Sequence, residues 1–388
     1  MNILIIPSWY STKDNPTNGS FFREQAHALK EGGNNVIVAF VEVRLFSKIN
    51  KKERVEVIDD NGVKTYRIIQ GKFPKTGNVG TAIAFRQGLK KIYREIIKSE
   101  KIDTVHLHSC IWGGIGGAYM AKKLKVPFVI TEHSSYYGRF KVNFIESQLI
   151  KYTLKKSDKV ISVSSYLKGI VSKYYKDDII IIPNMVDCNE FLSQKVNTKN
   201  TCDKFTFLSL CYLKKNKGVD ILIKAFSKYF NDENVELIVA GDGPERVNLE
   251  KLAVELGVSD KVKFKGALSR SEVKKEMSNC NVFALASRFE TFGVVLIEAL
   301  ASGKPVISTR NGGANDIVND FNGILVEVDN IDELGEKMYY MYKNYNNYDS
   351  YRIRKDCINK YSKEVIIKEL SQIYNDINSK ELVNKEIY

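Results

Sequence analysis

Residues 281–310 read NVFALASRFETFGVVLIEALASGKPVISTR, and they decide the fold class of this 388-residue chain. NVFALAS predicts a buried strand, residues 293–302 predict a helix that begins at a glycine, and KPVISTR predicts a second strand. This order is typical of a parallel βαβ unit. Two acids interrupt the apolar pattern, Glu290 in the loop and Glu298 in the helix. A buried carboxylate is costly unless something pairs with it, so both glutamates need an explanation.

Strands and helices alternate along most of the chain, in the same manner as in this stretch. The alternation predicts an α/β protein with two doubly wound, Rossmann-like domains that face a central cleft. A hairpin is expected around Asn61-Gly62. The predicted limits are 1–185 for the N-terminal domain, 186–203 for an irregular linker and 204–360 for the C-terminal domain, with 361–388 as one or more helices that pack back on the N-terminal domain.

The charge of the chain is uneven. The formal net charge is +13, and residues 1–190 hold 30 Lys and Arg against 18 Asp and Glu, a net of +12. A basic half and a neutral half predict different partners, and nucleic acid, an anionic membrane surface and a phosphate-bearing substrate are all candidates. No apolar run reaches the roughly 18 to 20 residues that a membrane span needs.

The cysteines and the first residues bear on the compartment. None of the six cysteines forms a CxxC pair, which argues against a zinc site and a disulfide framework and favours a reducing cytosol. MNILIIPSWY has neither a basic leading segment nor a small-residue cleavage site, so it predicts a first strand and not a signal peptide. A cytoplasmic protein is therefore expected.

The helix that begins at Gly293 offers a place for an anion, because free backbone N–H groups and the helix dipole meet there. Glu290 would accept hydrogen bonds from hydroxyls of such a ligand, and Glu298 would do so for a second hydroxyl-bearing group. These features together describe a ligand rich in phosphate and hydroxyls, such as a nucleotide sugar. In the alternative interpretation, Glu290 is a helix cap and Glu298 is a partnered acid in the core.

ETFGVVLIEALASGKPVISTRNGGANDIV resembles the E-x7-E region of the retaining glycosyltransferases of family 4, which have the GT-B fold. The segment that begins AGDGPERVNLEK resembles the C-terminal domain of this family. PSWYSTKDNPTNGSFFREQAHAL and DTVHLHSCIWGGIGGAYMAKKLKVPFVITEHSS resemble parts of its N-terminal domain. The similarity extends over residues 1–345, and it implies that the N-terminal domain binds the acceptor and the C-terminal domain binds the donor.

On the donor side, the resemblance implies a role for each matched residue. Glu290 would bind the hydroxyls of the transferred sugar and act in catalysis, Glu298 would bind the ribose, and Lys217 would contact the diphosphate and also act in catalysis. Taken alone, Lys217 would be a solvated lysine before a helix. The other matched positions are Gly19 for the diphosphate, Phe292, Gly293 and Val294 for the sugar and the distal phosphate, and Gly266 and Leu268 beside the base.

The chain departs from the family at Tyr212, where an arginine often contacts the diphosphate. A nearby base, Lys214 or Lys215, is a candidate to replace that contact.

Three histidines fall in the segments that resemble the N-terminal domain. His133 follows a predicted strand, matches the family histidine near the reacting sugar, and is the third predicted catalytic residue. His108 and Tyr136 are expected on the acceptor side. A strand histidine is more often a satisfied core residue, which is the alternative for His108 and for His106 on the same face. His27, on a helix, is predicted to be structural.

The resemblance implies a hexosyl-type transfer with retention, by front-face attack in which the leaving diphosphate helps to take the acceptor proton. No metal and no cofactor are expected, and UDP or GDP is the expected donor nucleotide. A nucleotide-sugar isomerase or hydrolase of the same fold, and a basic nucleic-acid-binding protein, are the alternatives. A dehydrogenase is disfavoured because no G-x-G-x-x-G follows the first strand.

A membrane surface is a further expected partner. On the predicted helix 82–99 and just beyond it, Lys90, Arg94, Lys98 and Lys101 form a stripe at helical spacing, and YYGRFKVNF at 136–144 combines aromatic residues with cations. Both suit docking on the anionic inner face of the cytoplasmic membrane, beside a lipid-linked acceptor of surface-polysaccharide synthesis. The alternative is a solvated basic helix.

Overall fold

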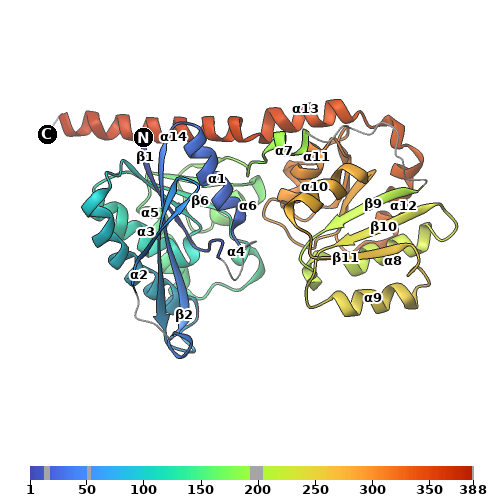
Figure 1. The fold of residues 1–388 in the computed structure, drawn as a ribbon, viewed down its shortest axis with the longest axis horizontal. Coiled ribbons are helices and arrows are strands. Elements are labelled where there is room, and N and C mark those ends of the chain that lie inside the picture. The colour runs from blue at the N-terminus through green and yellow to red at the C-terminus, as the bar shows by residue number, and fades with distance from the viewer. Residues whose placement is uncertain (13–17, 50–53, 193–203, 387–388) are drawn as a thin grey trace. The chain divides into compact units, whose positions relative to one another are not determined.

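The computed structural model describes residues 1–12, 18–49, 54–192 and 204–386. The chain divides into two compact units: unit 1 is Met1–Asn184 with Lys363–Tyr388, and unit 2 is Met185–Ser362. Each unit is built on one largely parallel sheet with helices packed on it (Figure 1). The predicted fold class, α/β with two doubly wound Rossmann-like sheets, is therefore confirmed.

Unit 1 has an eight-stranded sheet. Its strands are β1 (Asn2–Pro7), β2 (Asn35–Leu45), β3 (Glu56–Asp60), β4 (Val63–Lys72), β5 (Thr104–His108), β6 (Phe128–Glu132), β7 (Lys159–Ser162) and β8 (Ile179–Ile181). They are ordered β3-β4-β2-β1-β5-β6-β7-β8. Every neighbouring pair is parallel except β3 and β4, which form the hairpin predicted around Asn61-Gly62. β5 and β6 are buried along their whole length, as strands covered on both faces must be.

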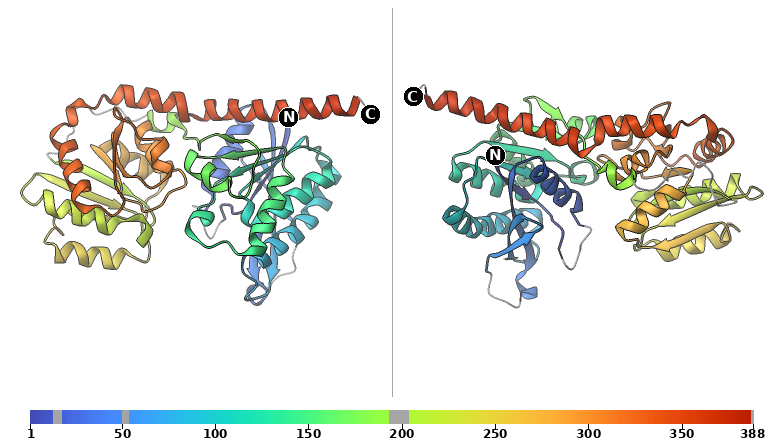
Figure 2. Two further views of the ribbon diagram at one scale, coloured as in Figure 1. Left: turned by 180° about the vertical axis from the view of Figure 1, so that it is seen from behind. Right: turned by 45° about the horizontal axis from the view of Figure 1, so that its top comes forward.

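Helices cover both faces of this sheet (Figure 2). They are α1 (Ser20–Glu31), α2 (Gly77–Ser99), α3 (Cys110–Leu124), α4 (Tyr136–Arg139), α5 (Phe144–Lys155), α6 (Ser165–Val171) and α14 (Lys363–Glu386), with a 3₁₀ turn η1 (Phe46–Lys48). The chain moves in one direction from β1 to β2 and in the other from β4 to β5. Right-handed crossovers therefore place α1 on one face and α2 and α3 on the opposite face. α2, α3 and α5 pack side by side there.

The C-terminal helix α14 is part of unit 1, although its sequence follows unit 2. It packs beside α1, and Lys363 Nζ lies 2.9 Å from a carboxylate oxygen of Glu31. Further along, the amide of Asn378 donates to Thr104 Oγ1 at 2.7 Å, and Tyr374 is fully buried against the sheet. The red helix in Figures 1 and 2 is this segment.

Unit 2 has a six-stranded, wholly parallel sheet. Its strands are β9 (Phe205–Leu210), β10 (Val235–Ala240), β11 (Val262–Gly266), β12 (Val282–Leu285), β13 (Val306–Thr309) and β14 (Gly323–Val326), ordered β11-β10-β9-β12-β13-β14. The helices are α7 (Cys188–Leu192), α8 (Val219–Tyr229), α9 (Arg246–Glu255), α10 (Arg270–Asn279), α11 (Val294–Ala301), α12 (Ile331–Lys343) and α13 (Ser350–Tyr361). Short 3₁₀ turns are η2 (Lys215–Lys217), η3 (Gly313–Asp316) and η4 (Tyr345–Asn347). The stretch at 281–310 forms β12, α11 and β13, as its pattern predicts.

The segment predicted as an irregular linker has structure in its described part. Helix α7 occupies residues 188–192, and Val186 bridges to Ser362, so this part belongs to unit 2. The rest of the predicted linker, residues 193–203, lies outside the described residues. Among the described helices, none is long and apolar enough to cross a membrane.

Candidate active site

The direction of the chain reverses in the sheet of unit 2 between β9 and β12. From β9 it proceeds to β10 and β11 on one side, whereas β12, β13 and β14 follow on the other. Ligands of open α/β sheets bind at the carboxyl ends of the strands, at such a switch point. The loops at this point, residues 211–218 after β9 and 286–293 after β12, hold four of the predicted donor-binding residues: Lys217, Glu290, Phe292 and Gly293.

Lys217 and Glu290 meet at this switch point. Lys217 Nζ lies 2.6 Å from Glu290 Oε1, which also accepts a hydrogen bond from Ser287 Oγ at 2.8 Å. Both partners are only partly exposed, at 24% and 16% of their side chains. The second carboxylate oxygen of Glu290 accepts no hydrogen bond from the described residues. The pair thus presents one ammonium group and one open carboxylate oxygen at the same point.

Arg288 ties the two loops together. Its guanidinium lies 3.2 and 3.0 Å from the two carboxylate oxygens of Asp220 and 2.7 Å from Asp329, and its backbone N–H donates to Asn216 O at 2.8 Å. These contacts hold the turn that carries Lys217. Gly218 completes the turn with φ +64°, and an added Cβ there would lie 1.9 Å from the carbonyl oxygen of Ala286. No local sequence pattern marks Arg288, because its partners Asp220 and Asp329 lie 68 and 41 residues away along the chain.

Helix α11 begins at Gly293, in the left-handed region at φ 101°. The preceding loop pairs with the loop after β13: Glu290 N–H donates to Asn311 O at 2.9 Å, and Gly313 N–H donates to Glu290 O at 3.0 Å. Phe292 is buried, with its ring edge-on to Tyr361. The loop that leads into the first turn of α11, from Val294, is therefore held in place by these contacts.

Glu298 lies on the buried side of α11 and pairs with a cation that the sequence analysis missed. Its Oε1 is bonded to Nη1 of Arg270, the first residue of α10, while the carboxylate itself is only 7% exposed. Arg270 also lies 3.3 Å from Glu190 and packs on the ring of Phe191. The structure thus contains the partnered acid of the alternative interpretation, and the partner holds the carboxylate in one orientation.

The remaining predicted donor positions surround the ends of β9 and β11. Gly266 has φ +70°, and its carbonyl accepts from Gly241 N–H at 2.7 Å; Leu268 follows it, half-buried. Tyr212 is 57% exposed, and Lys214 Nζ lies 4.8 Å from the centre of its ring. Tyr212 occupies the position where the family often has an arginine, and the ammonium group of Lys214 lies beside it.

In unit 1, the structure brings the predicted histidines together at the ends of β5 and β6. His108 Nδ1 lies 3.0 Å from His133 Nε2, and the ring centres of His106 and His108 lie 4.3 Å apart with the rings tilted by 37°. His106 bonds Tyr374 of α14 at 2.6 Å and Thr131 at 2.7 Å. Both ring nitrogens of His106 therefore have hydrogen-bond partners, in agreement with the alternative that His106 is a core residue.

Burial sets the charge of these rings. It lowers the pKa of His106 to about 3 and, together with the neighbouring His106, lowers the pKa of His133 to about 3. Burial likewise places the pKa of His108 well below its usual range. All three imidazoles are therefore neutral at physiological pH. His108 Nε2 is buried without a hydrogen-bond partner among the described residues.

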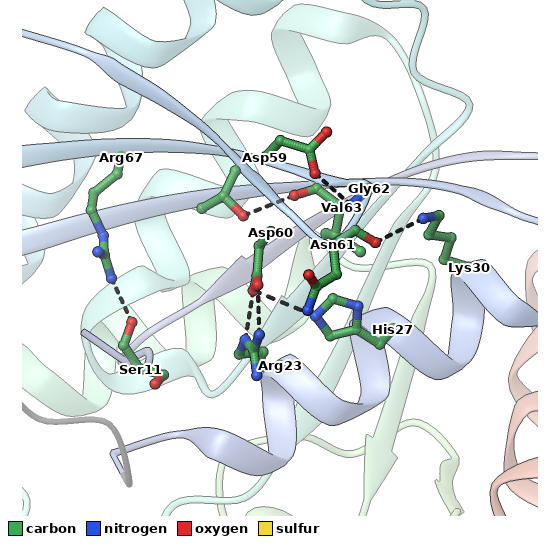
Figure 3. Close-up of polar contacts among 11 residues, drawn as sticks. Ser11, Arg23, His27, Lys30, Asp59, Asp60, Asn61, Gly62, Val63 and Arg67 are labelled. Atoms are coloured by element: carbon green, nitrogen blue, oxygen red, sulfur yellow. Dashed lines mark hydrogen bonds and ion pairs between the residues drawn. The ribbon is translucent and has the colours of Figure 1, made fainter. Parts of the chain in front are cut away.

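Gly19 begins α1, and its setting explains the glycine. It has φ +73°, and an added Cβ would lie 2.9 Å from the carbonyl oxygen of Trp9. The β3–β4 hairpin braces the segments on either side (Figure 3): Arg23 bonds both carboxylate oxygens of Asp60, and Arg67 donates to Ser11 O at 2.5 Å. The Arg23 guanidinium lowers the pKa of Asp60.

His27 and Tyr136, the other predicted residues of unit 1, have separate partners. His27 Nε2 lies 3.4 Å from Asp60 in the same hairpin contact, which agrees with a structural role (Figure 3). The Tyr136 hydroxyl donates to Glu146 at 3.1 Å, and its ring stacks on Phe140. Tyr136 is therefore held at the start of the segment that leads into α5.

The described residues contain no group of three or more His, Cys, Asp or Glu side chains placed to hold a metal ion. The cysteines at 110, 188, 211, 280 and 357 form no disulfide within the described residues, and the sixth cysteine lies outside them.

Comparison with known proteins assigns both parts of the chain. Residues 19–190 match the sequence family described as Glycosyltransferase Family 4, and residues 191–361 match the family described as Glycosyl transferases group 1. An uncharacterized glycosyltransferase of Methanocaldococcus jannaschii is 36% identical over 249 residues, which cover 64% of this chain and 68% of that protein. The alpha-monoglucosyldiacylglycerol synthase of Streptococcus pneumoniae is 29% identical over 246 residues, which cover 58% of this chain and 56% of that protein.

The fold has counterparts among solved structures. Anabaena HepE in complex with UDP superimposes with a TM-score of 0.76, covering 97% of this chain and 100% of that chain at 18% sequence identity. At this identity the likeness shows a shared fold.

Proposed function

Since the chain belongs to the family 4-type glycosyltransferases of the GT-B fold, we propose that it moves a sugar from a nucleotide-sugar donor to an acceptor hydroxyl with retention of configuration. The observation that carries this proposal is the Lys217–Glu290 pair at the switch point of unit 2, beside the first turn of α11. A phosphate group needs a cation and free N–H groups, and a sugar needs a hydrogen-bond acceptor. Both requirements are met within these two adjacent loops.

The chemical step follows from these groups. The bond between the anomeric carbon and the donor diphosphate breaks, a bond to the acceptor oxygen forms on the same face, and the acceptor proton moves to a diphosphate oxygen. Negative charge grows on the leaving diphosphate. Lys217 and the N–H groups from Val294 onward stabilise that charge, because they are already fixed before the reaction. Glu290 orients the sugar through its open carboxylate oxygen, and Glu298 accepts from the ribose hydroxyls.

For unit 1, we propose that Gly19 presents its backbone to the diphosphate and that His133 contacts the reacting sugar. A neutral imidazole both donates and accepts a hydrogen bond, so His133 suits a sugar hydroxyl. His108 Nε2 and Tyr136 are proposed contacts of the acceptor. The unpartnered buried nitrogen of His108 supports its role, because such a nitrogen costs free energy until a ligand satisfies it.

The positive charge that the leaving group needs comes from the chain itself, so the proposal requires no metal. Transfer activity is accordingly expected to be the same in the presence of a chelator as in the presence of added divalent cations. UDP or GDP is the proposed nucleotide, and the UDP bound in Anabaena HepE supports the first of these.

A thermal-shift series with UDP, GDP, ADP and their glucose and mannose derivatives tests the donor proposal. At least one nucleotide sugar is expected to raise Tm by several degrees, since a ligand at about 100 times its Kd adds about 2.7 kcal/mol. Proton NMR of the product then shows whether the anomeric configuration of the donor is kept. Failure of every nucleotide compound to stabilise the chain would refute the donor proposal, and an inverted product would refute retention alone.

Replacing Arg270 by methionine is expected to raise KM for the donor about tenfold with a smaller effect on kcat, because Glu298 loses the charge-assisted bond that orients it, worth about 1.5–3 kcal/mol. R270K should restore part of the affinity. K274M is a matched control, since Lys274 lies on the same helix and pairs with Glu190 instead of Glu298. Calorimetric titration with the nucleotide measures the same change in Kd. An unchanged KM in R270M would show that Glu298 needs no such orientation.

For the acceptor, we propose a glycan or lipid-linked saccharide of cell-surface polysaccharide synthesis, used at the inner face of the cytoplasmic membrane. The name of the Streptococcus pneumoniae relative states a glycolipid product, which supports an acceptor held in a membrane. The net charge of +12 over residues 1–190 supports an anionic surface as the place of reaction.

A further inference from the structure

Helix α5 exposes a face that combines apolar and basic side chains. Phe144 is 77% exposed, Ile145 58% and Tyr152 51%. The exposed residues of this helix, which we call the α5 face, are Phe144, Ile145, Gln148, Lys151, Tyr152 and Lys155. The one acid of the helix, Glu146, is buried and accepts from the backbone of Asn143. Apolar, aromatic and cationic groups without a carboxylate are the composition of a helix that lies in a membrane interface.

A basic groove adjoins this face, where β6 and β7 begin. It encloses about 800 Å³, and we call it the lysine groove after the four lysines that line it: Lys122, Lys125, Lys156 and Lys159. None of their ammonium groups makes a hydrogen bond or ion pair within the described part of the chain. Tyr152 belongs to both the groove and the α5 face. The other wall is mainly apolar, formed by Ala118, Ala121, Val126, Pro127, Phe128 and Ile377.

The groove carries an uncompensated positive charge. Its single acid, Asp158, already accepts a hydrogen bond from Phe128 N–H at 2.7 Å. Lysines are favoured at the ends of α3 and α5 by the helix dipole, but that effect leaves their ammonium groups free to bind anions. An apolar wall beside four unpaired cations fits a molecule with an anionic head and a hydrocarbon portion.

The stripe expected on α2 is less suited to this role. Lys98 is paired with Glu95 at 2.8 Å, and Lys90 lies over the ring of Tyr119. The cations of the α5 face and of the lysine groove, in contrast, have no ion-pair partner in the described parts of the chain, and exposed aromatic residues lie among them.

We propose that the α5 face and the lysine groove together dock this glycosyltransferase on an anionic phospholipid bilayer, with lipid phosphates on the groove lysines and with Phe144 and Ile145 among the acyl chains. The inference deepens the proposed function and rests on transfer to a membrane-held acceptor. The aromatic residues select a bilayer over a soluble polyanion, since only a bilayer offers hydrocarbon beside its phosphates.

The course of α5 connects this surface to the acceptor side. The helix begins after the carboxyl end of β6, near Tyr136, and ends where β7 begins, so it runs the length of the strands. Twelve residues of helix span about 18 Å. A bilayer in contact with the whole α5 face therefore lies beside Tyr136 at one end and beside the groove at the other. A lipid-linked acceptor would reach the Tyr136 end without leaving the membrane.

Vesicle flotation tests the proposal with the full-length chain. Vesicles of phosphatidylcholine with about 30% phosphatidylglycerol are expected to bind it, and phosphatidylcholine alone should bind it weakly. Each groove lysine changed to serine should weaken binding about fivefold, the fold-change that corresponds to about 1 kcal/mol. The quadruple variant K122S/K125S/K156S/K159S should thus lose binding by at least about 100-fold. F144S/I145S should weaken binding even at an ionic strength of about 1 M, where charges are screened.

A matched variant separates this surface from overall charge. K251S/K263S/K275S/K337S removes four exposed lysines of unit 2 and should bind vesicles within about threefold of the unchanged protein. Equal losses in both quadruple variants would overturn the groove as the docking site. A different result would overturn the membrane-docking proposal in favour of a polyanion site. In that result the unchanged protein binds nucleic acid in a gel shift but does not bind vesicles, and the groove variant loses the nucleic-acid binding.

Nucleotide binding keeps this test apart from the proposed function. The groove variant should show the same thermal shift with the nucleotide sugar as the unchanged protein, because the groove lies in unit 1 and the donor residues Lys217 and Glu290 lie in unit 2. Vesicle binding without any nucleotide shift would refute the donor proposal and leave the docking surface standing. A thermal shift with the nucleotide sugar but no vesicle binding would refute the docking surface and leave the donor proposal standing.

Discussion

E290Q and K217M are each expected to lower kcat/KM by about 10²- to 10³-fold, the effect of removing one fixed group that stabilises transition-state charge. K217M removes the ammonium group that we propose stabilises the leaving diphosphate, so its loss should fall on kcat. E290Q keeps the size of the side chain but removes the negative charge that we propose accepts from the sugar hydroxyls, so it should affect both kcat and KM. Initial rates over a range of donor concentrations separate the two parameters.

The double variant gives the sharper test of this pair. Because Lys217 and Glu290 are in direct contact at 2.6 Å, the combined loss should be smaller than the product of the single losses. K228M/D332N is the matched control, since it removes a surface Lys–Asp pair in the same unit and should leave kcat/KM unchanged. Full activity in E290Q would refute the catalytic role of Glu290, and strictly multiplicative losses would refute the coupling.

Unit 1 is expected to lose stability steeply as the pH falls below about 6.5. His106 and His133 have pKa values near 3 in the folded chain, whereas an unfolded histidine titrates near 6.5. Between these values the unfolded state binds more protons, so acid favours unfolding. Each histidine then contributes a loss of about 1.4 kcal/mol per pH unit, and two together give about 4 kcal/mol between pH 6.5 and 5. The stability is fully present above pH 6.5.

Tryptophan fluorescence reports this transition in unit 1 alone, because the two tryptophans of the chain are Trp9 and Trp112. Urea unfolding at pH 7, 6 and 5 yields the free energy of unfolding at each pH. H133N should lower the pH dependence of the free energy of unfolding by the contribution of about one proton. A free energy of unfolding that stays constant from pH 7 to pH 5 would show that the folded and unfolded chains bind the same number of protons over this range, which would contradict the lowered pKa of the buried rings.

Local patterns are sufficient for much of the fold. Continuous apolar runs predict the buried parallel strands, and Asn61-Gly62 predicts the β3–β4 hairpin, because backbone preferences and burial act over a few residues. The same local signals place Glu290 in a loop before a helix that begins at Gly293. His108 ends β5 and His133 follows β6, and the parallel pairing of these two strands brings their rings together.

Long-range contacts required the tertiary structure. Lys217 and Glu290 are 73 residues apart, and only the order of strands in the sheet, with β9 beside β12, makes them partners. The same holds for Arg270 with Glu298.

The limit between the two units also depends on distant contacts. Residues 186–192 fall in the predicted linker, and α7 and the bridge from Val186 to Ser362 make them part of unit 2.

By itself, the sequence determined the class of the protein: alternating strands and helices, the Glu290 and Glu298 motif, and an excess of charge in the first half. Only the tertiary structure decided which charged and polar side chains have a partner within the chain. It paired Glu298 with Arg270 and His106 with Tyr374 of the C-terminal helix, and among the described residues it gave the four groove lysines no ion-pair partner. The physical reason is range: side-chain periodicity acts over one or two turns, whereas an ion pair depends on which surfaces the folded chain brings within about 4 Å.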